Sequence, residues 1–332
     1  MKICVQTSPL IEKFGVDEAF RLLREAGFDA VDYNIDISLP YNVIVEGGHV
    51  PLYDADEEAL IEYARPVKEA GEKYGIAINQ MHAPFPCLVE NEEGNAYVME
   101  AIKRCIRVCG YLDCKYCIVH PFFLGYDKKL DPQTEWDINI ERYSQLIPFA
   151  KKYGVTICLE NMFTGYKGKI YAACCADMAE ANRYIDYLNN LAGEKVFGFC
   201  LDVGHALLVG KEIYSTIQEI SRNLVALHVH DNDGRNDQHL FPYMGVMDWD
   251  RFVKGLKDAG YKGALSFETF NAIHVIDDEL AQDALKFLGS VGRLFVKRIE
   301  DYGRKNSVRG AILRTDSLYE DIFSFVSPHL RR

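Results

Sequence analysis

The chain has 332 residues, of which 48% are hydrophobic and 26% charged, a composition that is ordinary for a globular protein and excludes a largely disordered chain. Its formal net charge of −12 opposes binding to nucleic acid or to anionic lipid, so we expect neither partner. We also expect a cytoplasmic protein, because the sequence has no signal-peptide core and no membrane-spanning apolar run, and five of its ten cysteines lie in apolar runs as free thiols do.

One unit recurs along the chain, namely a helical pattern that ends in glycine, a short apolar run, and then an abrupt polar residue. Together with the opening run at residues 3–6, it gives eight candidate strands, within residues 26–32, 74–82, 115–120, 153–160, 196–202, 224–228 and 261–268. The intervals hold amphipathic stretches of helical length, such as residues 57–74 and 139–153. Gly75 and Gly154 are expected to end these two helices.

Apolar strands that alternate with helices are typical of a buried parallel sheet, and eight such units predict a single (β/α)8 TIM barrel. An open doubly wound sheet is the alternative, but no Gly-x-Gly-x-x-Gly turn follows the first strand. We expect a catalytic barrel domain at residues 1–275, with a long loop at residues 34–53 that covers the barrel mouth. A helical extension at residues 276–332, with a helix over 278–302, is expected to pack on the barrel.

Six successive strands end in a residue that can bind a divalent metal, and these are His82, His120, Glu160, Asp202, His228 and Glu268. They are spaced 38 to 42 residues apart, except for the 26 residues between Asp202 and His228. In a barrel all six lie at the C-terminal face, where active sites form. Carboxylates at such close quarters repel one another unless a cation neutralises them. The sequence therefore predicts a metal site at this face.

Three further residues can join this set. His205 follows Asp202 closely, and Asp237 and His239 lie in the loop after the seventh strand. They are interpreted either as ligands of a second or third ion, or as a substrate-binding histidine and two ordinary loop residues. His230 lies on the same side of its strand as His228 and either supports the ligands or packs in the core.

The motifs around these residues resemble the xylose-isomerase-like barrel superfamily, which includes sugar phosphate isomerases, ketose 3-epimerases and type IV apurinic endonucleases. The resemblance covers residues 1 to about 270. It rests on His82-Ala83-Pro84-Phe85, Val119-His120-Pro121, Leu159-Glu160-Asn161, Leu201-Asp202-Val203-Gly204-His205, His228-Val229-His230-Asp231, Asp237-Gln238-His239 and Phe267-Glu268-Thr269.

The resemblance implies a divalent metal cofactor (zinc, manganese, magnesium or cobalt), with one core ion held by Glu160, Asp202, His228 and Glu268. In the epimerases, the counterparts of Glu160 and Glu268 also act as acid and base. The endonuclease branch adds two zinc ions, which would be held here by His82, His120 and Glu160, and by His205, Asp237 and His239. Up to three ions can therefore be accommodated.

We accordingly expect a divalent-metal-dependent isomerase or epimerase of a sugar or sugar phosphate. It would abstract a proton next to a carbonyl and pass through a metal-stabilised enediolate. Glu160 and Glu268 are the expected catalytic residues, and His205, Arg235 and Asn161 are expected to bind the substrate. Tyr166 replaces a substrate-binding glutamate of the ketose 3-epimerases, which also lack the pair His82 and His120, and this departs from a free-ketose epimerase.

Alternatives from other classes stay open at this point. One is a multi-zinc hydrolase of the type IV apurinic endonuclease kind acting on a phosphoester, and another is a lyase or dehydratase acting on a related sugar. A third is a metal-bound sugar sensor without catalytic activity. Related barrels often form dimers or tetramers, so the resemblance also raises the expectation of a homo-oligomer.

Overall fold

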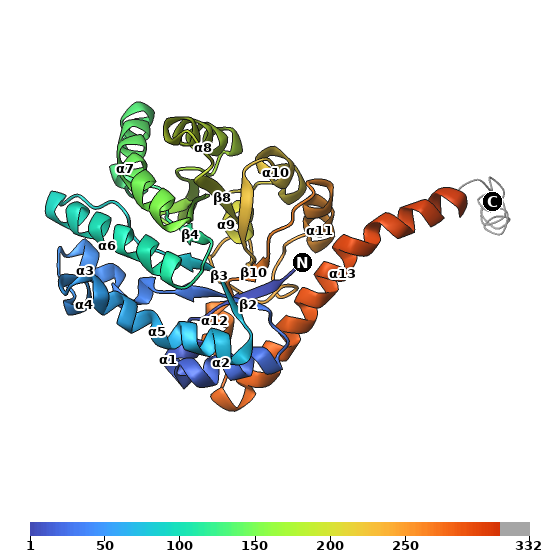
Figure 1. Ribbon diagram of the computed structural model, residues 1–332. Coiled ribbons are helices and arrows are strands. Elements are labelled where there is room, and N and C mark those ends of the chain that lie inside the picture. Colours follow the sequence, from blue (N-terminus) through green and yellow to red (C-terminus); the bar gives the residue numbers. More distant parts are fainter. Residues whose placement is uncertain (313–332) are drawn as a thin grey trace.

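Eight parallel strands form a barrel at the centre of the protein, as the sequence predicts (Figure 1). The computed structural model describes residues 1–312, with side chains described for residues 1–300. A parallel bridge between Val229 and Phe267 joins the last two strands and closes the barrel. In their hydrogen-bonded order the strands are β10 (Leu265–Phe267), β1 (Ile3–Gln6), β2 (Ala30–Asn34), β3 (Ala77–His82), β4 (Tyr116–Ile118), β5 (Thr156–Glu160), β8 (Phe197–Asp202) and β9 (Leu224–His228).

Helices surround this barrel, which makes the fold a TIM barrel. The longer ones are α2 (Val16–Glu25), α5 (Glu57–Tyr74), α6 (Glu92–Tyr111), α7 (Pro132–Tyr153), α8 (Met178–Ala192), α10 (Ile213–Ile220), α11 (Trp249–Asp258) and α13 (Ala281–Ile312). The shorter ones are α1 (Leu10–Phe14), α3 (Tyr41–Val45), α4 (Pro51–Asp54), α9 (Val203–Leu208) and α12 (Phe270–His274). Within the described residues, none of these helices combines the length and apolar character that a membrane crossing requires.

Local capping explains where two of the expected helices begin and end. Gly75 and Gly154 have φ values of 64° and 66°, a left-handed conformation that favours glycine, and they end α5 and α7 as predicted. However, α7 begins at Pro132 rather than at residue 139. Asp131 accepts hydrogen bonds from two backbone N–H groups of its first turn, and proline suits the first helical position.

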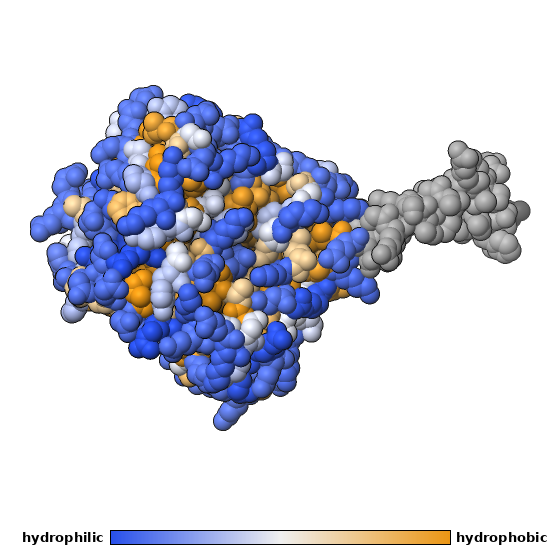
Figure 2. Space-filling view, viewed as in Figure 1, coloured by the Kyte–Doolittle hydropathy of each residue, from blue (hydrophilic) through white to orange (hydrophobic). Residues whose placement is uncertain are grey.

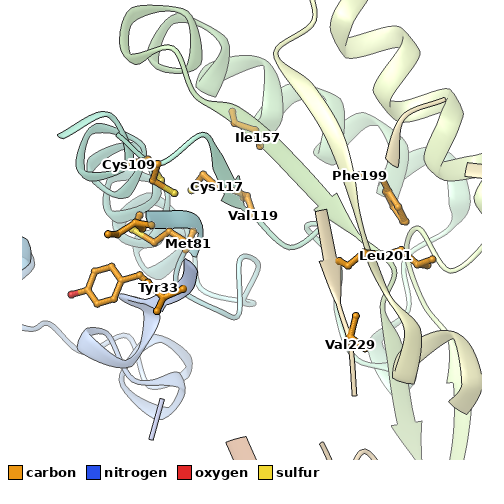
Figure 3. Packing of buried hydrophobic residues seen from close by; sticks show 14 of the residues in the cluster. Tyr33, Met81, Cys109, Cys117, Val119, Ile157, Phe199, Leu201 and Val229 are labelled. Atoms are coloured by element: carbon orange, nitrogen blue, oxygen red, sulfur yellow. The ribbon is translucent and has the colours of Figure 1, made fainter. Parts of the chain in front are cut away.

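The strands present alternate side chains to the surrounding helices and to the interior of the barrel. Figure 3 shows outward-facing residues, among them Met81, Cys117 and Leu201, in the apolar layer beneath the helices. Inside the barrel, Cys158, Cys200 and other small residues form a separate cluster. All ten cysteines are free and buried, as expected for thiols that pack as small hydrophobes. The outer face seen in Figure 2 is mostly hydrophilic, with apolar residues in small groups.

Two segments at the barrel mouth differ from their expected structure. Residues 34–53 contain α3, α4 and a 3-10 turn at Asp36–Ser38, so the expected loop is partly helical. A hairpin of β6 (Phe163–Tyr166) and β7 (Lys169–Ala172), which the sequence did not predict, follows β5. Its tight turn places Lys167 and Gly168 at φ values of 50° and 72°, as turns that match the strand twist require. Lys-Gly is a weaker hairpin signal than Asn-Gly or Asp-Gly.

Helix α13 packs against α2, α11 and β1, and its C-terminal part projects from the barrel (Figure 1). Its larger buried side chains among the described residues are Leu285, Leu288, Val291, Phe295 and Ile299. A 3-10 turn at Asp278–Leu280 precedes it, so the helix begins three residues later than expected and extends beyond 302. The proposed domain boundary between residues 275 and 276 stays a prediction, and residues 313–332 of the expected extension lie outside the described part of the chain.

Because Phe295 is fully buried and its ring stacks on Trp249 at a centroid distance of 5.2 Å, this part of α13 contributes to the core of the barrel. We predict that Phe295→Ala lowers the free energy of unfolding by about 3–5 kcal/mol, as measured by urea denaturation. The control Leu294→Ala removes a neighbouring side chain that is 39% exposed, and it should cost well under half as much. Equal losses for the two variants would contradict this role of α13.

Candidate metal centre and active site

The expected ligands converge inside the C-terminal end of the barrel. His228 lies at the centre, and its Nδ1 is 3.2 Å from Glu160 Oε2, 3.6 Å from Glu268 Oε2 and 3.9 Å from Asp202 Oδ2. All of these side chains are buried. Both carboxylate oxygens of Glu160 and both ring nitrogens of His228 nevertheless lack a hydrogen bond of normal geometry among the described residues. Buried polar atoms that approach one another without bonding are expected around a cation.

A second group of ligands lies beside this centre. His82, His120 and Glu160 each offer an atom within 4.8 Å of the others. His120 Nε2 is 3.3 Å from Glu160 Oε2, and the rings of His82 and His228 stack at a centroid distance of 4.4 Å. Glu160 therefore contacts both groups, as the resemblance implies for a ligand shared between two ions.

A third group joins His205, Asp237 and His239, and His230 lies with them. His239 Nε2 is 2.9 Å from Asp237 Oδ2, and His205 Nε2 is 3.6 Å from the same oxygen. The Asp237 Oδ1 atom is buried without a hydrogen bond. The structure thus brings together all nine residues that the sequence singled out as ligands.

Three of the histidines are held so that one ring nitrogen faces the site. The Nδ1 atoms of His205 and His239 lie 2.9 and 3.0 Å from the backbone carbonyl oxygens of Asn161 and Glu268, and His82 Nδ1 lies 3.1 Å from Asp32 Oδ1. The Nε2 atom of each ring therefore points toward the other candidate ligands. This is how metal-binding histidines are commonly oriented by a second partner.

Asp32 is the site residue that the sequence interpretation missed. In the sequence it is a polar residue after an apolar run, which is the signal that identifies the other candidate ligands, but in the structure it lies in the middle of β2 rather than at its end. It is fully buried, and its two oxygens lie 3.1 Å from His82 Nδ1 and 3.3 Å from His228 Nε2. Asp32 therefore orients two histidines at once.

His230 and Asn161 support Asp202. His230 Nε2 is 3.1 Å from both carboxylate oxygens of Asp202, so His230 contacts a ligand rather than merely filling the core. Gly204 permits this position, because a Cβ there would lie 2.0 Å from the His230 ring. Asn161 exchanges two hydrogen bonds of 2.8 and 2.9 Å with the backbone of Asp202. Its amide is thus occupied by the protein, although we had expected it to bind substrate.

The loop between β9 and α11 is organised by Asp231. Its carboxylate accepts hydrogen bonds from the backbone N–H groups of Asn232, Tyr243 and Met247 and from the Trp249 indole. This network fixes the segment that carries Asp237 and His239. Arg235, which we had expected to bind substrate, is exposed on the same loop and is not among the residues that line the cavity above the site.

The electrostatics of the site follow from its burial and its mixed charges. Burial alone would raise the pKa of Glu160, but His228 and His120 outweigh it and hold that pKa well below its usual value. Burial likewise opposes a charge on His82, but the Asp32 carboxylate prevails and raises the pKa of His82 to about 9. Glu160 is therefore ionised, and in the absence of a metal His82 holds a proton that compensates part of the carboxylate charge.

A cavity of about 760 Å³ opens directly above these residues. Its floor includes His120, Glu160, His205 and Glu268, and Tyr41 and Val45 from the segment after β2 line its rim, where that segment was expected to lie. A small molecule that enters this cavity meets two glutamates and the ligand groups at once. The arrangement suits acid–base chemistry assisted by a divalent cation.

Comparisons with known proteins agree with this fold. Fructoselysine 3-epimerase of Shigella flexneri is 21% identical over 262 residues, which cover 77% of this chain and 86% of that protein. Inosose isomerase of Bacillus velezensis is 22% identical over 278 residues, which cover 81% and 89%. The structure of a D-tagatose 3-epimerase-like protein matches with a TM-score of 0.68 and 21% identity, covering 91% of this chain and 99% of that one.

The structure of the IolI protein with a bound zinc atom matches with a TM-score of 0.63 and 18% identity, again covering 91% of this chain and 99% of that one. A sequence model of the xylose isomerase-like TIM barrel matches residues 20–291, which is most of the chain. The resemblance inferred from the strand-end motifs is therefore confirmed, and this chain belongs to the xylose isomerase-like TIM barrel family.

Proposed function

We propose that this protein is a divalent-metal-dependent isomerase or epimerase of a sugar. One observation carries the proposal: Glu160 and Glu268 come from separate strands and both line the floor of one cavity, beside buried ligand atoms that lack hydrogen bonds. Two carboxylates on one substrate cavity suit removal of a proton from carbon and its return. The relatives named as a fructoselysine epimerase and an inosose isomerase support a sugar as the substrate.

The residues fit a divalent cation. The core set would be Glu160, Asp202, His228 and Glu268, a mixture of nitrogen and oxygen donors that zinc and manganese accept. A bound cation would polarise a carbonyl group and a neighbouring hydroxyl of the substrate. The zinc atom in the IolI structure supports this assignment.

The protein's own groups perform the remaining tasks. Glu160 is ionised on the cavity floor and can therefore accept a proton from carbon, and Glu268 can return a proton from a different part of the barrel rim. His205 lines the cavity and can hold a substrate oxygen. The assignment of Arg235 and Asn161 to substrate binding stays a prediction, as do the cytoplasmic location and the homo-oligomer.

A multi-zinc phosphoester hydrolase is the second candidate, and the close approach of all nine ligands favours it. The net charge of −12 opposes a nucleic-acid substrate. Metal analysis separates the two: three zinc ions per chain together with phosphodiesterase activity would favour the hydrolase, and one ion per chain would remove it. Lyase chemistry on a related sugar uses the same proton abstraction and would be recognised by its products.

We predict that the metal-loaded protein exchanges a carbon-bound hydrogen of a sugar with deuterium from solvent, as measured by NMR on a panel of ketoses, inososes and sugar conjugates. Glu160→Gln and Glu268→Gln should each lower the exchange rate by about 10²–10⁴-fold, because each removes one proton-transfer group. Glu72→Gln changes an exposed glutamate of α5 and should have no effect. Absence of exchange by the wild-type protein across the panel would refute the proposal.

Metal affinity should rise with pH, because a cation that binds at His82 must displace the proton that this histidine holds. Since the pKa of His82 is raised to about 9, this histidine is protonated at neutral pH in the metal-free protein. We expect zinc and manganese affinity to increase between about pH 6 and 8, by roughly tenfold per pH unit for each proton displaced. Calorimetry in buffers of different ionisation enthalpy measures both the metal affinity and the number of protons released on binding. A pH-independent affinity would contradict this arrangement.

Asp32→Asn should lower metal affinity by about 10–100-fold, because the neutral amide orients and polarises His82 and His228 less well than the carboxylate does. Competition with a chromophoric chelator measures the affinity, and the thermal midpoint of each metal-free variant shows whether the fold is retained. Asp283→Asn alters an aspartate that is 79% exposed on α13 and should bind metal as the wild type does. Unchanged affinity in a folded Asp32→Asn variant would disprove the orienting role.

A further inference from the structure

The walls of the active-site cavity differ sharply in character from its floor. The floor is polar and carries the glutamates and ligand histidines, whereas the walls are mainly aromatic and aliphatic. At about 760 Å³ the cavity lies in the size range of pockets that enclose drug-sized ligands, which is larger than a single sugar ring needs. The part of the cavity that the sugar does not fill is therefore mainly apolar, with Glu90, Asn91, Lys128 and Thr164 as its polar members.

Three phenylalanines stand directly against the ligand histidines. The ring centroids of Phe85 and His120 are 4.9 Å apart, those of Phe163 and His205 also 4.9 Å, and those of Phe270 and His239 4.1 Å. These rings come from three different segments of the barrel mouth, namely the loop after β3, strand β6 and helix α12. They enclose the reacting group on several sides and leave it few hydrogen-bond partners other than the floor.

The apolar wall continues from these rings to the opening of the cavity. The ring of Tyr41 lies 6.0 Å from that of Phe85 and is 59% exposed, so a row of aromatic groups leads from His120 to solvent. Leu88, Val89, Phe123 and Leu124 also line the cavity. A large apolar surface that stays accessible in this way marks a binding groove.

The cavity offers no free cation for a phosphate group. Lys128 is the one lysine or arginine among the described residues that line it, and its ammonium is paired with Glu90 at 2.6 Å. Helix α6 begins beside the cavity, but Glu92 and Glu93 occupy its first turn and oppose an anion there. Glu90, Glu160, Asp237 and Glu268 add negative charge to the lining.

From these observations we propose that the substrate is an unphosphorylated sugar joined to an uncharged, apolar group of aromatic-ring size, which lies along the wall formed by Tyr41, Phe85 and Phe123. The proposal rests on the proposed function and specifies its substrate class. A free sugar would leave hydroxyl groups without partners against the apolar wall, at a cost in free energy. A phosphate ester that extends from the sugar along the wall would meet Glu90, and the one lysine there is already paired with that glutamate. A sugar with an aromatic substituent places its hydroxyl groups at the polar floor and its ring against the apolar wall.

Calorimetry on the full-length protein tests this, with and without bound zinc. The probes are para-nitrophenyl and methyl β-glycosides of glucose, galactose and xylose, and glucose phosphate. For at least one sugar we expect the para-nitrophenyl glycoside to bind about tenfold or more tightly than the methyl glycoside, because it buries an additional ring. This preference should persist without zinc. Equal affinities in every pair, no measurable binding of any aryl glycoside, or tighter binding of the sugar phosphate would overturn the proposal.

Two variants locate the bound ring. Tyr41→Ala and Phe123→Ala should each weaken binding of the para-nitrophenyl glycoside by about three- to tenfold and leave that of the methyl glycoside unchanged. Because Tyr41 is largely exposed, its removal does not threaten the fold. Tyr187→Ala removes a tyrosine of similar exposure on α8, away from the cavity, and should change neither affinity. Unchanged affinities in both cavity variants would place the ring elsewhere and refute the assignment.

The two proposals fail in distinguishable ways. A protein that binds aryl glycosides in this wall but catalyses no exchange of carbon-bound hydrogen would refute the proposed function and retain the binding site. A protein that catalyses exchange on free sugars, without any preference for an aryl substituent in binding, would refute only the substrate class.

Discussion

Repulsion among five carboxylates is the constraint around which the upper end of the barrel is built. Asp32, Glu160, Asp202, Asp237 and Glu268 come from different segments, and all are largely buried. Six imidazoles lie between them, and their contacts hold the pKa of Glu160 and Asp202 low despite burial. Histidines compensate this negative charge only while they are protonated. Under the proposed function, a bound divalent cation would replace these protons and compensate the charge instead, with the deprotonated histidines and the same carboxylates as its ligands.

The residues that contact the candidate ligands from outside the site determine how rigidly those ligands are held. Asp32 contacts two histidines, His230 contacts Asp202, and backbone carbonyls fix the rings of His205 and His239. Asp231 binds the loop that carries Asp237. Each contact limits the rotation of a ligand, so less conformational entropy is lost when a cation binds. The barrel strands supply rigid anchor points, and the loops complete the set.

The apolar walls act on the same charges from the outside. Phenylalanine rings packed against His120, His205 and His239 keep water from the ligands and lower the local dielectric, which strengthens every electrostatic interaction on the floor. The same rings extend the cavity beyond the space that a sugar requires. Under the proposed function, selection of the substrate and activation of the proton-transfer groups would both depend on these segments of the barrel mouth.

The sequence alone predicts the barrel and the convergence of six strand-end residues, because parallel strands share one C-terminal face at which their last polar residues gather. The remaining features depend on tertiary packing. Asp32 became part of the site through contacts with β3 and β9, Asn161 turned toward Asp202, and Arg235 lies exposed outside the cavity. The hairpin of β6 and β7 and the aromatic wall depend on how loops distant in sequence pack across the mouth, and no local periodicity encodes such packing.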